Sequence, residues 1–188
     1  MKVGLFFGSF NPIHVGHLII ANHVIEHTDL KEIWFVVSPQ NPLKSSSSLL
    51  NEYQRLHLVQ LAIEGDIRFK DSNIEFKLPR PSYTIETLAY LKEKYPTHEF
   101  SVIMGGDSYS NIHNWKNHEA ILKNYRIIVY SRVGSETQND NKSHIYLTAP
   151  VLNISSTFIR NQIKEGKSVK YLVSDAVYEE LRNSNYYK

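Results

Sequence analysis

Cysteine is absent from this chain, and its absence excludes several kinds of protein. Without thiols there is no disulfide framework, no thiolate metal site and no cysteine nucleophile. No apolar stretch approaches the ~20 residues that a membrane-spanning helix needs, and the apolar run from Val3 to Phe7 is too short for a signal peptide. The sequence therefore predicts a cytoplasmic protein that does not enter a membrane.

A strong charge of either sign is also missing. The 188 residues include 21 Lys and Arg against 19 Asp and Glu, which gives a formal net charge of +2. Because no dense run of Lys or Arg is present, nucleic acid is not expected as a partner. The composition, 41% hydrophobic and 21% charged, is that of a globular protein. The length predicts one domain, residues 1–188, and is compatible with a homo-oligomer.

Strand-like apolar runs alternate with segments of helical periodicity along most of the chain. We expect strands at 3–7, 33–37, 100–104, 126–130 and 144–147, and either a strand pair or a strand with a loop at 67–69 and 74–78. We expect helices at about 14–27, 50–63, 83–95, 115–122, 154–164 and 174–181. This alternation predicts an α/β fold with a doubly wound parallel sheet.

Polar or glycine-rich segments directly follow several of these strands. They come after Phe7, Val37, Met104 and Leu147. Ligands of doubly wound sheets gather outside the carboxyl ends of the strands. We therefore expect these segments to converge on one crevice.

The stretch from Gly8 to His17 has the local features of a phosphate site. It follows a strand, contains a glycine turn and opens a helix, whose unpaired N–H groups and dipole favour an anion. His14 and His17 are three residues apart, so they share one face of the first turn. Either histidine alone would more simply cap or pack the helix.

Two segments resemble known signatures. Gly8 to His17 resembles the HxGH signature of the nucleotidyltransferases, and Ile154-Ser155-Ser156-Thr157-Phe158-Ile159-Arg160 resembles their second signature. Within that superfamily the middle of the chain is similar to nicotinate-nucleotide adenylyltransferases, in the segments 39–44, 81–88, 105–108 and Trp115. The resemblance implies a Rossmann-like fold. It also implies a reaction of NAD biosynthesis, in which ATP and nicotinate mononucleotide give deamido-NAD and pyrophosphate, with Mg²⁺.

The resemblance also implies an ATP site built from both signatures. His14, His17 and Arg160 would be the catalytic residues, with His17 nearest the α-phosphate. The ATP-binding set would be Gly8, Ser9, Phe10, His14, Gly16, His17, Gly106, Asp107, Ile154, Ser156, Thr157 and Arg160. Gly8, Ser9 and Phe10 would offer backbone N–H groups, and Asp107 would hold a ribose hydroxyl or influence Mg²⁺. A helix-capping serine with a solvated arginine is the simpler alternative for the second signature.

For the mononucleotide, the resemblance implies contacts from the middle of the chain. Lys44 would contact the phosphate, Ser82, Tyr83 and Thr84 the pyridine carboxylate, and Trp115 would stack on the pyridine ring. Arg55 would help bind a phosphate or form a surface ion pair.

Adenylyl transfer suits such residues. The attacking group is a phosphate oxygen that is already ionised, with a second pKa of ~6, so no general base is required. The protein must position two polyanions and neutralise the leaving pyrophosphate. No protein metal site is expected, and Mg²⁺ would arrive with ATP.

Two departures from the family pattern stand out. Asn11 replaces a common aspartate and can still cap a helix, but it supplies no negative charge. The segment 42–44 lacks the Pro-Pro-His that many members carry.

Three alternatives stay open at this point. The chain could adenylylate nicotinamide mononucleotide or phosphopantetheine instead, or it could be a non-catalytic nucleotide sensor on the same fold. A tRNA-ligase-like enzyme shares the HxGH pattern, but this chain is too short for a tRNA-reading domain.

Overall fold

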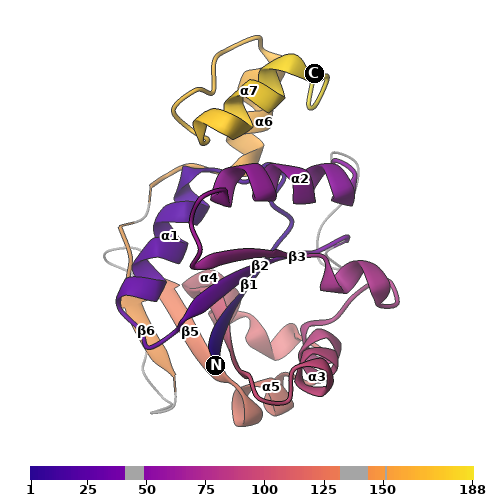
Figure 1. Cartoon of the computed structure of the whole chain (residues 1–188), viewed down its shortest axis with the longest axis vertical. Helices are drawn as coiled ribbons and strands as arrows, with labels where there is room; N and C mark the ends of the chain where they lie inside the picture. The colour runs from indigo at the N-terminus through magenta and orange to yellow at the C-terminus, as the bar shows by residue number, and fades with distance from the viewer. Residues whose placement is uncertain (41–48, 132–143, 151) are drawn as a thin grey trace.

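The computed structural model describes residues 1–40, 49–131, 144–150 and 152–188. These residues form a six-stranded sheet in the order β3-β2-β1-β4-β5-β6, and every neighbouring pair of strands is parallel (Figure 1). The strands are β1 (Lys2–Gly8), β2 (Glu32–Val37), β3 (Phe69–Ser72), β4 (Glu99–Gly105), β5 (Arg126–Ser131) and β6 (Ile145–Thr148). The strand order reverses between β1 and β4, so the carboxyl ends of these two strands form the switch point where ligands bind.

Helices cover both faces of this sheet (Figure 1). They are α1 (Val15–Glu26), α2 (Glu52–Ile63), α3 (Thr84–Lys94), α4 (Gly106–Ser110), α5 (His118–Asn124), α6 (Ser156–Lys164) and α7 (Asp175–Asn183), with 3₁₀ turns η1 (Ile74–Lys77) and η2 (Ile112–Asn114). Phe6 of β1 packs into a core shared with α1, α2, α6 and α7, while its neighbour Leu5 packs into a second core with α3 and α5. The predicted doubly wound sheet is confirmed.

Of the two alternatives expected for residues 67–78, the strand pair is wrong, and the region contains one strand. Only residues 69–72 form a strand, and Ile67 is 85% exposed. Residues 74–77 form η1, in which Ile74 and Glu75 are both buried. The alternation of apolar and polar residues suggested a strand with an exposed face. The Glu75 carboxylate instead points inward, where it accepts hydrogen bonds from Ser82 and Thr87.

The region after β4 also differs from expectation. Helix α4 begins at Gly106, directly after the strand, where a glycine turn was expected. The helix expected from Trp115 begins only at His118. Asn117 adopts a left-handed conformation, with φ of 52°, and this separates Trp115 from α5. Trp115 therefore follows η2 on a loop.

Candidate active site

The loop between β1 and α1 carries the first signature. Phe10 lies in it with a φ of 44°, is 2% exposed, and packs edge-on against Phe6 and His17. A Cβ atom on Gly8 would lie 2.7 Å from the Phe10 ring, so only glycine fits at that position. The Phe10 side chain is thus part of the core, and only its backbone is available to a ligand.

The two histidines at the start of α1 lie against one another. His14 is the N-cap of α1, and its ring centroid is 3.8 Å from that of His17. The backbone N–H of His14 donates to Nδ1 of His17 at 3.2 Å, which leaves Nε2 of His17 as the protonated ring nitrogen. Burial lowers the pKa of His14 to about 4, so its imidazole is neutral near pH 7. In the free protein His14 therefore presents a neutral imidazole at the start of α1.

Gly16 lies directly against the ring of His14. A Cβ atom at this position would lie 3.0 Å from Nδ1 of His14. That separation is tighter than an ordinary contact, so a side chain at Gly16 would displace the His14 ring. Glycine is therefore needed to hold the histidine pair in place.

The second signature docks onto the first. Ser156, at the start of α6, donates to the carbonyl of Pro12 at 2.9 Å. Arg160 donates to the carbonyl of Asn11 at 2.8 Å and to the hydroxyl of Thr157 at 3.2 Å. Ser156 and Arg160 therefore share one helix face, as their spacing predicted. This face brings the two ends of the resemblance into direct contact.

Other members of the second signature lie around this contact. Ser155 is the N-cap of α6, and its side chain accepts from the N–H of Phe158 at 3.2 Å. Ile154 is half-buried against the core, whereas Thr157 is exposed.

A cavity of about 840 Å³ opens at the carboxyl ends of the central strands. Seven of the predicted site residues line it, namely Gly8, Ser9, Ser82, Tyr83, Thr84, Asp107 and Trp115. The remaining predicted residues within the described ranges do not line it, namely Phe10, His14, Gly16, His17, Gly106, Ile154, Ser156, Thr157 and Arg160. Lys44 lies outside the described residues. The loop after β1 therefore borders the cavity at Ser9 and leads to the two histidines, which lie outside the cavity at the start of α1.

The start of α3 forms one wall of this cavity. Tyr83 is the N-cap of the helix and Thr84 its first residue, and both line the cavity. The first N–H groups of a helix have no partner within it and favour an anion. The Lys116 ammonium lies 4.5 Å from the centre of the Tyr83 ring and 2.6 Å from the Glu86 carboxylate. This wall thus offers donors and a positive charge.

Glu75 was not predicted as part of the site. It lines the cavity although it is 3% exposed, and it accepts hydrogen bonds from Ser82 at 2.8 Å and from Thr87 at 2.9 Å. Burial raises the pKa of its carboxyl, although the hydroxyls of Ser82, Thr87 and Ser38 act in the opposite direction. The Ser82 hydroxyl is therefore already engaged. An acidic residue between Ile74 and Phe76 was the only signal in the sequence.

Both roles expected for Arg55, a phosphate contact and a surface ion pair, are wrong. Its side chain is completely buried, so it forms no surface ion pair and is not open to a phosphate. The guanidinium donates to four carbonyls, those of Ser9 at 2.6 Å, Leu50 at 2.7 Å, Ser38 at 2.8 Å and Pro39 at 3.0 Å. Burial lowers the pKa of this guanidinium. Arg55 thus ties the loop after β1 to the loop after β2.

Asn11 does not cap α1, because His14 occupies the N-cap position. The Asn11 side-chain oxygen instead accepts from the N–H of Leu50 at 3.1 Å and from the hydroxyl of Tyr187 at 2.8 Å. The side chain is therefore used to hold the loop.

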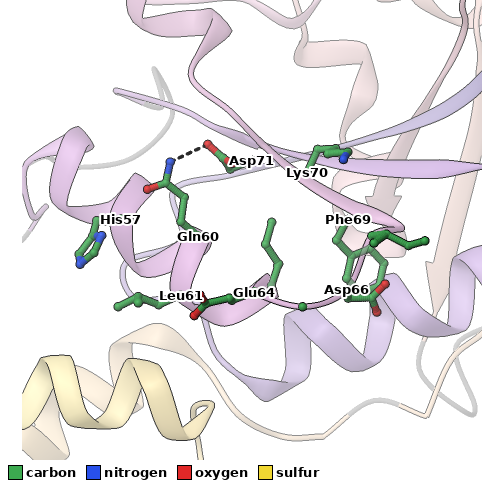
Figure 2. Close-up of a pocket in the computed structure, with 11 residues that line it drawn as sticks. His57, Gln60, Leu61, Glu64, Asp66, Phe69, Lys70 and Asp71 are labelled. Atoms are coloured by element: carbon green, nitrogen blue, oxygen red, sulfur yellow. Dashed lines mark hydrogen bonds between the residues drawn. The ribbon is translucent and has the colours of Figure 1, made fainter.

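A second hollow, of about 450 Å³, lies between the end of α2 and β3 (Figure 2). Its lining includes Gln60, which donates to Asp71 at 3.0 Å, together with Glu64, Asp66 and Lys70. It contains none of the predicted site residues and lies at the amino end of β3, away from the switch point.

Comparisons with known proteins agree with the two docked signatures. The model of the family described as cytidylyltransferase-like matches residues 5–162. A protein of Flavobacterium johnsoniae named "Probable nicotinate-nucleotide adenylyltransferase" is 55% identical over 192 residues, which cover 100% of each chain. This chain belongs to the nicotinate-nucleotide adenylyltransferase family. A member from Bacteroides fragilis is 46% identical over 96% of this chain and 90% of its own length.

Solved structures agree with the fold. A nicotinic acid mononucleotide adenylyltransferase of Plasmodium falciparum, complexed with NaAD, matches with a TM-score of 0.82. It is 19% identical, and the match covers 99% of this chain and 97% of that one. The Rossmann-like fold expected of an adenylyltransferase is therefore confirmed.

Within the part of the chain that the structure describes, no helix is long and apolar enough to cross a membrane. Nor does any group of three or more His, Asp or Glu residues there have an arrangement that could hold a metal ion.

Proposed function

We propose that this chain transfers the adenylyl group of ATP to nicotinate mononucleotide, forming deamido-NAD and pyrophosphate in NAD biosynthesis. The supporting observation is the shared loop after β1. Gly8 at the end of β1 and Ser9 at the start of the loop line the same cavity as Tyr83 and Trp115. The other end of the loop leads into the histidine pair at the start of α1. One loop can therefore hold the two substrates next to each other.

The triphosphate would lie at the start of α1. His14 and His17 would act as N–H donors, assisted by the backbone N–H groups of the loop and by Arg160. A phosphate oxygen of the mononucleotide would attack the α-phosphorus of ATP, and pyrophosphate would leave with the electron pair of the broken P–O bond. Donors preorganised around the developing charge lower the barrier. Ser156 would support this half through its bond to Pro12.

The mononucleotide would occupy the cavity. Trp115 would stack on the pyridine ring, and the N–H groups at the start of α3, near Tyr83 and Thr84, would receive the pyridine carboxylate. A helix N-terminus favours an anion over a neutral group, which favours the acid over the amide. We propose Asp107 and Gly106 as ribose and ATP contacts, and Lys44 as a phosphate contact.

Magnesium would enter with the ATP phosphates, because the described donors around the histidine pair do not form a protein metal site. It would supply charge neutralisation of the triphosphate. We further propose that the protein works in the cytoplasm; its assembly into oligomers stays a prediction.

A panel of acceptors tests this function. Pyrophosphate release is measured with ATP and, separately, nicotinate mononucleotide, nicotinamide mononucleotide and phosphopantetheine. We expect the highest kcat/KM with the nicotinate compound. A preference for either other acceptor would overturn the specificity. No release with any acceptor, together with measurable ATP binding, would indicate a nucleotide sensor.

A further inference from the structure

The C-terminal end of the chain returns to the first signature. Helix α7 ends at Asn183 and lies beside α2, where Glu180 and His57 approach to 4.0 Å (Figure 1). Beyond it, the hydroxyl of Tyr187 donates to the side-chain oxygen of Asn11 at 2.8 Å. A contact thus joins residues 176 positions apart.

Asn11 is held from several directions at once. Its side-chain oxygen also accepts from the N–H of Leu50 at 3.1 Å, and its backbone carbonyl accepts from Arg160 at 2.8 Å. Asn11 is 6% exposed, so its amide lies among protein atoms. The position of the loop between Ser9 and His14 therefore depends on bonds made to this residue.

The geometry of Tyr187 indicates that its contact is not incidental. Its backbone has a φ of +65°, in the left-handed region that residues other than glycine seldom adopt. Such a conformation persists where surrounding contacts enforce it, and the ring packs against the core shared by α1 and α2. Burial raises the pKa of the hydroxyl, which therefore stays protonated and donates at physiological pH.

We propose that Tyr187 is a positioning residue for ATP: through Asn11 it holds the first-signature loop in the conformation that receives the triphosphate. Tyr187 does not line the acceptor cavity. Substitution of Tyr187 should therefore change the binding of ATP and leave the binding of the mononucleotide nearly unchanged. The inference rests on the proposed function, because it assumes that the loop carrying His14 and His17 binds ATP.

The direct test is Tyr187→Phe, which removes the hydroxyl and keeps the ring. Loss of one such hydrogen bond corresponds to about a three- to tenfold effect, so we expect KM for ATP to rise by that factor. KM for nicotinate mononucleotide should change less than about twofold. Tyr186→Phe is the matched control, because Tyr186 is the neighbouring tyrosine and packs against the same core. Equal changes in both KM values, or none in either, would overturn the proposal.

A double-mutant cycle tests the route through Asn11. If Tyr187 acts through that amide, Tyr187→Phe should have little further effect on ATP binding in an Asn11→Ala background. Independent, additive losses would contradict the route. Deletion of residues 187 and 188 provides a stronger second variant and should also weaken ATP binding selectively.

Direct measurement of ATP affinity by calorimetry separates this inference from the proposed function. If the wild-type protein binds ATP but adenylylates none of the acceptors, the proposed function is wrong. The ATP affinity of Tyr187→Phe would still show whether Tyr187 positions the loop. If the variant binds ATP as tightly as the wild type, the positioning role fails, whatever the acceptor.

Discussion

Two walls of the site are held in place by buried side chains of opposite charge. At the loops after β1 and β2, Arg55 is completely buried and its guanidinium binds the backbone carbonyls of Ser9 and Ser38. On the mononucleotide side, Glu75 is 3% exposed and its carboxylate accepts from the hydroxyls of Ser82 and Thr87. Each charge is thus satisfied by polar groups that carry no charge.

The two charges differ in how they respond to pH. The guanidinium of Arg55 stays protonated at every working pH, and the carbonyls around it accept its hydrogen bonds. Near an acceptor that carries a carboxylate and a phosphate, a buried negative charge would be repulsive. The raised pKa of Glu75 favours its uncharged form and so weakens that repulsion. One wall is therefore fixed by a constant charge, and the other by a carboxyl whose charged form burial disfavours.

The largest effect is expected on the ATP side. His17→Ala should lower kcat by about 10²–10³-fold, the usual cost of removing one donor to a developing oxyanion. KM for the mononucleotide should change little, since His17 does not line the cavity. Steady-state pyrophosphate release gives both constants. His23→Ala, farther along the same helix, is the control, and near-normal turnover in His17→Ala would contradict the assignment.

The next effect concerns the buried arginine. Arg55→Met should lower the free energy of unfolding by about 3 kcal/mol, because several buried carbonyls lose their donor. Urea unfolding measures this value. Arg80→Met is the comparison, since the half-exposed Arg80 pairs with Glu52 at 2.6 Å and should cost at most about 1 kcal/mol. Equal losses in the two variants would show that Arg55 is no more important than a surface ion pair.

A smaller effect is expected at Trp115, where a substitution should change KM for the mononucleotide but not KM for ATP. Trp115→Ala should raise KM for nicotinate mononucleotide about tenfold, in line with the ~1–3 kcal/mol of aromatic stacking on a base. KM for ATP should stay within about twofold. Trp115→Phe, which keeps an aromatic face, should recover most of the affinity. A larger rise in KM for ATP than for the mononucleotide would contradict the assignment of Trp115 to the mononucleotide site.

The smallest effect is a pH dependence at Glu75. The folded protein holds the pKa of this carboxyl above its ordinary value of 4.5. As pH rises from 4.5 toward the raised value, the unfolded chain loses its proton first, so the wild-type protein loses stability through this window. Glu75→Gln lacks that loss. Its Tm relative to wild type should therefore increase between pH 4 and 7, and a constant difference would rule out the buried charge as the cause.

The sequence predicted the strands, most helices and the family, because periodicity and signature spacing are local properties. It did not reveal the roles of Arg55 and Glu75. The partners of Arg55 are carbonyls, which every residue carries, so no pattern marks Ser38 or Pro39 as acceptors. The Glu75 segment was expected to be a strand or a loop, since alternation alone does not show which way a carboxylate points. The contact between Asn11 and Tyr187 depends on folding across nearly the whole chain. The individual ligand contacts stay predictions.

The order of the sheet has a consequence for how this protein can vary. Glu75, Ser82, Tyr83 and Thr84 all belong to the single connection between β3 and β4, whereas the two signatures lie outside it. One wall of the cavity is thus a continuous segment of the chain, which can vary without altering the histidine pair. Exchanging residues 73–95 between family members would change that wall, while Trp115 and the ATP-binding frame stayed as they are.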